Sequence, residues 1–187
     1  MKTEHALALG LKKMMSHQPI DSISVLELSN KCGVSRKTFY YHYHDIYDLL
    51  TQIFLEEKIQ GASSAENFQA LITCVFNYYK ANEPFVNATL NSAGKDLFSE
   101  FIYNTFYTSS LRFINLIDVN KRLTPAYKKS IARFYAYGYG HSTVYYLSNY
   151  RHKTLQGLLS SFNFIDAKNF EKNVQKAIKN VENNEKL

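Results

Sequence analysis

Apolar side chains recur at helical spacing through almost the whole chain, and this period most constrains the fold. The first such stripe, in residues 4–15, consists of Leu7, Leu11, Met14 and Met15. No stretch alternates apolar and polar residues for long enough to form a sheet. The chain also has only 7 glycines and 3 prolines in 187 residues, too few for a long linker or a turn-rich sandwich. We therefore predict an all-α protein.

Capping and breaking residues divide this pattern into separate helices. Pro19 ends the first helix, Gly33 is suited to the left-handed turn after a short one, and Thr124 with Pro125 begins a long one. The predicted helices span residues 4–15, 25–31, 36–41, 45–60, 68–82, 84–91, 95–117, 125–149 and 166–183.

Small residues at positions 60–64 indicate a domain boundary. We expect an N-terminal domain over residues 1–50, with a connecting helix over about 45–60. A second helical domain is expected over residues 61–187.

The charge balance does not by itself identify a partner. There are 22 Lys and Arg against 16 Asp and Glu, but the first fifty residues hold only six basic against five acidic residues. No run of about 18 apolar residues could span a membrane, and no secretory signal begins the chain. Cys32 and Cys74 lack a C-x-x-C spacing, which favours a reduced chain. We expect a cytoplasmic protein without a membrane partner.

Residues 24–50 read SVLELSNKCGVSRKTFYYHYHDIYDLL and contain two short helical segments around a tight turn. Ser24 and Glu27 have the spacing of a capping box, and Ser35 is the cap of the next segment. Gly33 supplies the turn. This arrangement is typical of a helix-turn-helix.

The same stretch resembles the DNA-binding domain of the TetR family of bacterial transcriptional regulators, whose motif reads approximately A-x-x-A-G-V-S-x-x-T-[LF]-Y-x-H-F. The positions in register are Gly33, Val34, Ser35, Thr38, Phe39, Tyr40, His42, Tyr43 and Leu49. Ile46 stands where the family often has a phosphate-contacting lysine. This variant looks like a subgroup from low-GC Gram-positive bacteria that includes the activator of dihydroxyacetone kinase genes. The resemblance implies a three-helix DNA-binding domain joined to a helical domain for ligand binding and dimerisation.

The second helix of such a motif lies in the major groove, with its first turn facing base edges. Arg36 suits a bidentate contact with guanine, and Lys37 suits guanine or phosphate. Thr38 and Tyr41 suit a thymine methyl group or a phosphate.

The resemblance also implies phosphate contacts for Tyr40 and His42. Ser24 and Ser35 cap helices whose N–H groups can face phosphates. The predicted DNA-binding set is therefore Ser24, Ser35, Arg36, Lys37, Thr38, Tyr40, Tyr41 and His42.

Other residues of the motif have plainer interpretations. Val34 and Phe39 by their spacing, and Tyr43 as an aromatic, are expected in the core. His42 and His44, with Cys32 nearby, could form part of a zinc site, but no third ligand follows at a suitable spacing. We expect neither a metal nor a cofactor.

The aromatic residues of the second domain are interpreted as mostly core, but tyrosine hydroxyls need partners when buried. The resemblance implies an effector pocket in this domain, and we predict that it is lined by some of Tyr103, Tyr107, Tyr135, Tyr139, His141 and Tyr145. The basic residues are interpreted as a solvated loop and helix start, with recruitment of an anion as the alternative; they are Lys121, Arg122, Lys128, Lys129 and Arg133.

One recognition helix supplies few base contacts, each contributing about 1–3 kcal/mol of discrimination. Specific binding exceeds non-specific binding by roughly 4–10 kcal/mol. We therefore expect a homodimer on a pseudo-palindromic operator, and the resemblance implies pairing through the last two long helices. The expected partners are operator DNA and an unknown small-molecule effector or co-regulator. The motif does not distinguish a repressor from an activator.

An alternative is an all-α protein-interaction module without operator specificity of its own. An enzyme is disfavoured, because the sequence has no phosphate-binding glycine loop, paired carboxylates or nucleophile and base grouping.

Overall fold

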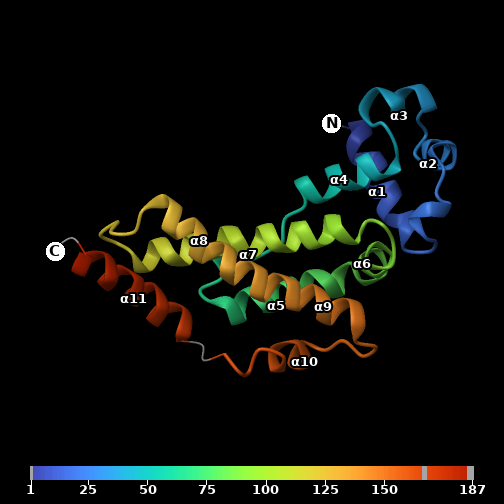
Figure 1. Cartoon of the computed structure of the whole chain (residues 1–187). Coiled ribbons are helices and arrows are strands. Elements are labelled where there is room, and N and C mark those ends of the chain that lie inside the picture. The colour runs from blue at the N-terminus through green and yellow to red at the C-terminus, as the bar shows by residue number, and fades with distance from the viewer. Residues whose placement is uncertain (1, 166–167, 185–187) are drawn as a thin grey trace. The chain divides into compact units, whose positions relative to one another are not determined.

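Every regular element that the structure describes is a helix (Figure 1). The computed structural model describes residues 2–165 and 168–184, and no residue in these ranges lies in a strand. The α-helices are α1 (Lys2–Met15), α2 (Val25–Lys31), α3 (Arg36–His42), α4 (Ile46–Glu56), α5 (Phe68–Ala81), α6 (Glu83–Leu90), α7 (Lys95–Ile117), α8 (Pro125–Ala136), α9 (Ser142–Asn149), α10 (Leu155–Ser160) and α11 (Asn169–Asn184). Short 3-10 helices span Ile20–Ser22 and Ala62–Ser64. The all-α prediction is confirmed, and none of the described helices is long and apolar enough to cross a membrane.

The long helix predicted over residues 125–149 is interrupted. A π turn at Tyr137–His141 separates α8 from α9 and contains Gly138 and Gly140. Two glycines weaken an α-helix, and a π turn is the usual form of a local widening. A Cβ added to Gly140 would lie 3.4 Å from the Tyr103 Cα, so α7 and the π turn approach closely here.

Two other boundaries differ from the prediction. Helix α4 ends at Glu56, before Gln60, because the backbone turns extended at Glu57 (φ −64°, ψ 140°). Helix α10 was not predicted; Thr154 caps it by accepting from the Gly157 N–H at 3.0 Å. The predicted start of the last helix, at Asp166, lies outside the described residues.

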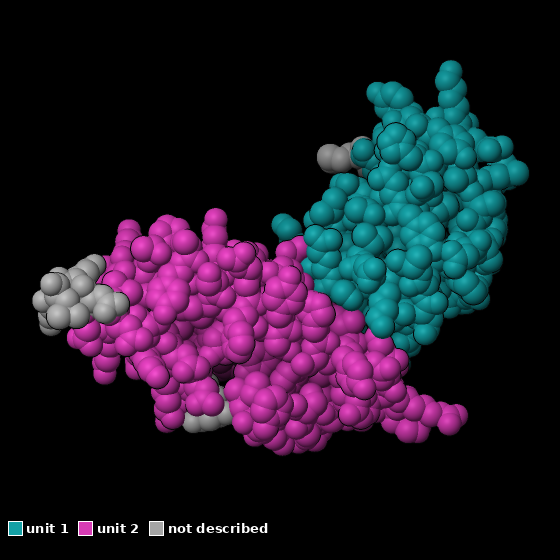
Figure 2. Space-filling view, viewed as in Figure 1, with its two compact units in different colours: residues 1–58, 79–101 teal, residues 59–78, 102–187 magenta. Residues whose placement is uncertain are grey.

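The chain forms two compact units (Figure 2). Unit 1 comprises residues 1–58 and 79–101, and unit 2 comprises residues 59–78 and 102–187. Helices α5 and α7 therefore each contribute residues to both units.

Unit 1 contains two groups of buried side chains. One is an aliphatic core from α1, α2 and α4, and the other is a cluster of aromatic rings. Leu7, Leu28 and Leu49 are fully buried in the first. In the second, the Phe54 ring lies 5.7 Å from that of Phe85. The apolar stripes predicted from helical spacing thus form the interior of this unit.

Unit 2 is built around Phe68 at the start of α5. Its ring contacts five others, those of Phe106, Phe113, Tyr135, Tyr139 and Phe170. The Tyr139 ring is the nearest, stacked at 4.2 Å between centroids. Unit 2 therefore contains a cluster of packed rings, which lies among buried aliphatic side chains such as Leu71 and Ile114.

Candidate nucleic-acid interface

The turn between α2 and α3 has the geometry of a Schellman motif. Gly33 adopts a left-handed conformation (φ 67°) and donates to the Asn30 carbonyl at 3.2 Å. The Val34 N–H donates to the Ser29 carbonyl at 3.0 Å. Both bonds satisfy carbonyls that the end of α2 leaves open, so the turn is fixed by local chemistry.

Serine caps begin both helices of the motif, as predicted. The Ser24 hydroxyl accepts from the Glu27 N–H at 3.1 Å, and the Ser35 hydroxyl accepts from the Thr38 N–H at 3.0 Å. The hydroxyls of Ser35 and Thr38 also lie 2.8 Å apart and share a hydrogen bond. The Glu27 carboxylate accepts from the Gln18 amide at 3.4 Å, rather than completing the expected capping box.

Helix α3 buries one edge and exposes the rest. Phe39 is fully buried and Tyr43 is 7% exposed, in agreement with the sequence prediction, whereas Val34, in the turn before α3, is only half-buried. By contrast, Tyr40 is 50% exposed and Tyr41 is 85% exposed. The buried ring of Phe39 contacts the ring of Tyr40 edge-on at 5.5 Å, which anchors the helix beneath its exposed side chains.

Of the predicted DNA-binding residues, Ser24 lies at the start of α2, and the others belong to α3 or to its cap, Ser35. Ser24, Ser35, Arg36, Lys37, Tyr40 and Tyr41 are exposed, whereas Thr38 and His42 are half-buried. The Arg36 guanidinium lies 5.9 Å from the centre of the Tyr40 ring, within the range of a cation–π contact. The exposed residues of α3 thus present cationic, hydroxyl and aromatic groups to solvent.

His42 also faces inward to α1. Its Nδ1 atom lies 3.3 Å from the Glu4 carboxylate. Glu4 was not among the predicted site residues, because the contact joins two helices that are distant in sequence.

The start of α4 carries a reciprocal cap that was not predicted from the sequence. The Asp45 carboxylate accepts from the Asp48 N–H at 2.8 Å, and the Asp48 carboxylate accepts from the His44 N–H at 2.9 Å. The D-x-x-D spacing could have revealed it. Ile46, in the position of the family's lysine, is 7% exposed and belongs to the core.

Tyr47, beside Ile46, donates its hydroxyl hydrogen to the Asp21 carboxylate at 2.5 Å. Burial and this hydrogen bond raise the pKa of Tyr47 to about 12. The side chain therefore remains a neutral donor, which ties α4 to the segment before α2.

Cys32 has a structural environment in this unit. Its thiol donates to the Ala6 carbonyl at 3.4 Å, and burial raises its pKa. Across the described part of the chain, no three His, Cys, Asp or Glu side chains are grouped so that they could hold a metal ion.

The residues predicted to line an effector pocket are distributed over three places in unit 2. Tyr135 and Tyr139 belong to the ring cluster around Phe68, and the Tyr135 hydroxyl accepts from the Asn173 amide at 2.9 Å. Tyr103 and Tyr107 stack at 5.9 Å between centroids.

The remaining members of that set lie nearer the surface. The Tyr103 ring also lies 4.8 Å from the Tyr137 ring, and the Tyr137 ring lies 5.2 Å from the His141 ring, measured between centroids. His141 and Tyr145 help to line a hollow of about 390 Å³. Tyr145 itself is 64% exposed.

A separate groove lies between α8 and α11, with a volume of about 360 Å³. It is lined by Tyr127, Ser130, Ile131, Phe134, Tyr135, Asn173 and Ala177. Of the predicted pocket residues, Tyr135 lines this groove. Its other lining residues were not predicted, because they come from two helices whose pairing the sequence does not reveal.

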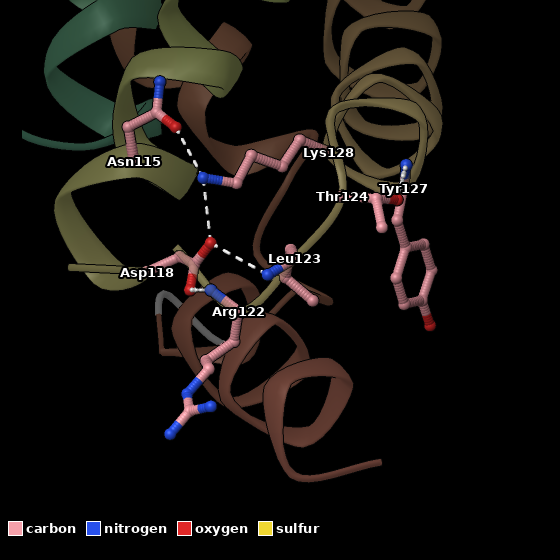
Figure 3. Close-up of polar contacts among 7 residues, drawn as sticks. All are labelled: Asn115, Asp118, Arg122, Leu123, Thr124, Tyr127 and Lys128. Carbon is pink, nitrogen blue, oxygen red and sulfur yellow. Dashed lines mark hydrogen bonds and ion pairs between the residues drawn. The ribbon is translucent and has the colours of Figure 1, made fainter. Parts of the chain in front are cut away.

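The loop between α7 and α8 corrects the interpretation of Lys128 as a solvated side chain (Figure 3). Its ammonium group lies 2.8 Å from the Asp118 carboxylate and donates to the Asn115 side chain at 2.9 Å. The Asp118 side chain is 1% exposed and that of Lys128 is 13% exposed. The physical reason is that a buried carboxylate requires a cation.

Asp118 also accepts from the backbone N–H groups of Arg122 at 2.8 Å and Leu123 at 3.1 Å (Figure 3). Burial alone would raise the pKa of Asp118, but the bonds from Lys128, Arg122 and Leu123 outweigh it and lower the pKa. The carboxylate thus fixes the loop, and Thr124 caps α8 by accepting from the Tyr127 N–H at 3.2 Å.

Comparisons with known proteins identify the family. Residues 66–165 match a family model of the TetR type described as a transcriptional regulator C-terminal region. No curated protein matches the sequence. Among solved structures, the dihydroxyacetone kinase operon activator DhaS has a similar fold, with a TM-score of 0.61, 20% sequence identity, and coverage of 95% of this chain and 96% of that one. The chain has the N-terminal helix-turn-helix and the helical C-terminal region of these proteins, and it belongs to the TetR family of transcriptional regulators.

Proposed function

We propose that this chain is a sequence-specific, ligand-responsive transcriptional regulator that acts in the cytoplasm and binds a pseudo-palindromic operator as a homodimer. Residues 1–50 form the DNA-binding domain, and residues 61–187 bind the effector and pair the subunits. The membership of the TetR family and the fold shared with DhaS support this proposal.

The observation that carries the proposal is the exposed side of α3. Arg36, Lys37 and Tyr41 stand in solvent on a helix anchored by the fully buried Phe39. Tyr41 is 85% exposed and thus contributes little to packing, whereas a base or phosphate could use its ring and hydroxyl. Arg36 is assigned to a guanine, and Tyr40 and His42 to phosphates.

Dimerisation follows from the energetics of recognition. A single short helix offers few contacts of about 1–3 kcal/mol each, so two copies are needed for useful specificity. Exposed aromatic residues on α8, the π turn and α9 support pairing through these helices. They are Phe134 at 74% exposure, Tyr137 at 56% and Tyr145 at 64%.

Effector binding is assigned to unit 2. The groove between α8 and α11 has apolar walls and a polar pair, the Tyr135 hydroxyl and the Asn173 amide, which could orient a ligand. A ligand that prefers one spacing of the two recognition helices would change operator affinity by its differential affinity for the two states.

A gel-shift assay tests the DNA-binding function, with duplex DNA from upstream of the chain's own gene and with a random oligonucleotide pool. Wild type should select one sequence, and its affinity should fall with salt. Arg36→Ala with Thr38→Ala should abolish that selection. Lys176→Ala, a change at an exposed lysine of α11, is the matched control and should bind like wild type.

Unchanged selection by the double variant would contradict the assignment of α3. A folded dimer that selects no sequence from the pool would instead favour a protein-interaction module. Bound density in the groove between α8 and α11, in crystals of protein taken from crude extract, would identify the class of effector.

A further inference from the structure

Glu4 of α1 and His42 at the end of α3 form a contact that the proposed function does not yet use. The Glu4 Oε1 atom lies 3.3 Å from the His42 Nδ1 atom. Both side chains are partly shielded, with 43% of Glu4 and 22% of His42 exposed. The contact therefore lies at the edge of the helix-turn-helix and not in its core.

The imidazole ring is held on further sides by two tyrosines. The Tyr41 ring lies edge-on at 5.1 Å, and the Tyr43 ring lies at 6.1 Å. Tyr43 is itself 7% exposed, so one of these neighbours is part of the packed interior. The His42 ring is therefore flanked by the rings of Tyr41 and Tyr43 as well as by the Glu4 carboxylate.

A protonated histidine donates from both ring nitrogens. With Nδ1 directed at the Glu4 carboxylate, Nε2 is the nitrogen left to serve a second acceptor. A carboxylate that orients a histidine in this way determines which nitrogen meets the functional partner.

We infer that Glu4 is a positioning residue for DNA binding: it holds His42 so that the Nε2–H group donates to a backbone phosphate. This inference rests on the proposed DNA-binding function. Ordering the ring before DNA arrives removes part of the entropic cost of forming the contact. Glu4 does not touch DNA and acts through His42.

The sign of the effect separates this role from general electrostatics. Glu4 is an anion close to the proposed phosphate site, so simple charge repulsion predicts that removing it tightens DNA binding. A positioning role predicts the opposite, namely weaker binding when Glu4 is removed.

The experiment is a double-mutant cycle with Glu4→Ala, His42→Gln and the combined variant, measured as operator affinity across a salt series. The DNA is the duplex selected by wild type. Each single variant should lose roughly tenfold in affinity, the size expected for one charged contact. Each should also reduce the salt slope by about one per protomer, because a phosphate contact is lost.

The combined variant should bind no more weakly than either single variant, because both remove the same contact. Glu27→Ala is the matched control, since it removes a similar exposed carboxylate from α2, and its salt slope should stay as in wild type. Thermal unfolding monitored by circular dichroism defines a temperature at which all the variants are folded. If Glu4→Ala is not folded there, Glu4→Leu, which also lacks an acceptor, takes its place in the cycle and should give the same coupling.

Equal or tighter binding by the Glu4 variant would overturn the inference, as would a loss that persists when His42 is already replaced. The proposed function has its own control in the Arg36 and Thr38 double variant. If that variant loses selection while the Glu4 variant behaves like wild type, the positioning role alone fails.

Discussion

Tyrosines in the helix-turn-helix and tyrosines in unit 2 are placed by different forces. In α3, Tyr41 is 85% exposed one position before the half-buried His42, and its location follows from the short capped helix that carries it. In unit 2, Tyr139 is 7% exposed because its ring packs against the rings of Phe68, Phe106 and Phe162, which come from other parts of the chain. Burial raises the pKa of Tyr139 to about 12, so it stays neutral in that interior.

This difference explains why the spacing of the motif determines which residues of α3 are exposed, whereas the tyrosines predicted for one pocket of unit 2 lie in several places. Along a two-turn helix, the buried position of Phe39 determines which neighbours are exposed. In unit 2, a tyrosine can lie in the core, stack on another ring at the surface or line a groove, depending on which helix packs against it. Tyr135 and Tyr145, both predicted for one pocket, thus lie in different surroundings.

The largest expected effect contrasts Phe39 with Tyr41. Phe39→Ala should lower the free energy of unfolding by about 3–5 kcal/mol, the usual result of emptying a buried aromatic site. Tyr41→Ala should change it by less than about 0.5 kcal/mol, as surface substitutions do, while weakening operator binding. Urea denaturation followed by circular dichroism measures the first quantity. Equal destabilisation by both variants would mean that the Tyr41 side chain packs against the rest of the protein and does not face solvent.

The next effect concerns the buried carboxylate of unit 2. Asp118→Ala removes the partner of Lys128 and the acceptor of two backbone N–H groups, those of Arg122 and Leu123, and should lower the free energy of unfolding by about 3 kcal/mol. Lys129→Ala is the matched control, because Lys129 follows Lys128 in the sequence and is exposed. It should change the free energy of unfolding only slightly.

The same residue predicts a pH dependence. The folded state lowers the pKa of Asp118, so its contribution is complete above the ordinary aspartate pKa and is lost as the pH falls through the lowered value. Wild type should therefore lose more stability than Asp118→Ala on acidification. Parallel stability curves for the two proteins would show that the carboxylate is not stabilised in this way.

The smallest effects compare glycines in the two units. Gly138 in the π turn has open space around an added Cβ, so Gly138→Ala should raise stability by about 0.5–1 kcal/mol. A Cβ on Gly10 of α1 would lie 2.4 Å from the Cys32 sulfur, so Gly10→Ala should destabilise by about 1–3 kcal/mol. Thermal unfolding of both variants should move in opposite directions. A shift of the same sign would show that packing at one of these sites differs from the structure.

Much of the fold could be predicted from sequence because its signals are local. The caps at Ser24, Ser35 and Thr124 each accept from the N–H group three residues later, as their spacing indicates. The left-handed Gly33 and the buried Phe39 also follow from neighbouring residues. The interruption at Tyr137–His141 did not follow, because two glycines permit a π turn without requiring one.

The sequence by itself determined the helical class, the ends of most helices and the composition of the exposed side of α3, because hydrogen bonds and apolar periods act over a few residues. The tertiary structure decided that Glu4 meets His42, that Lys128 neutralises Asp118, and that the tyrosines of unit 2 divide between core and surface. Each of these depends on side chains from different helices, and only the packing of the helices brings them within contact distance.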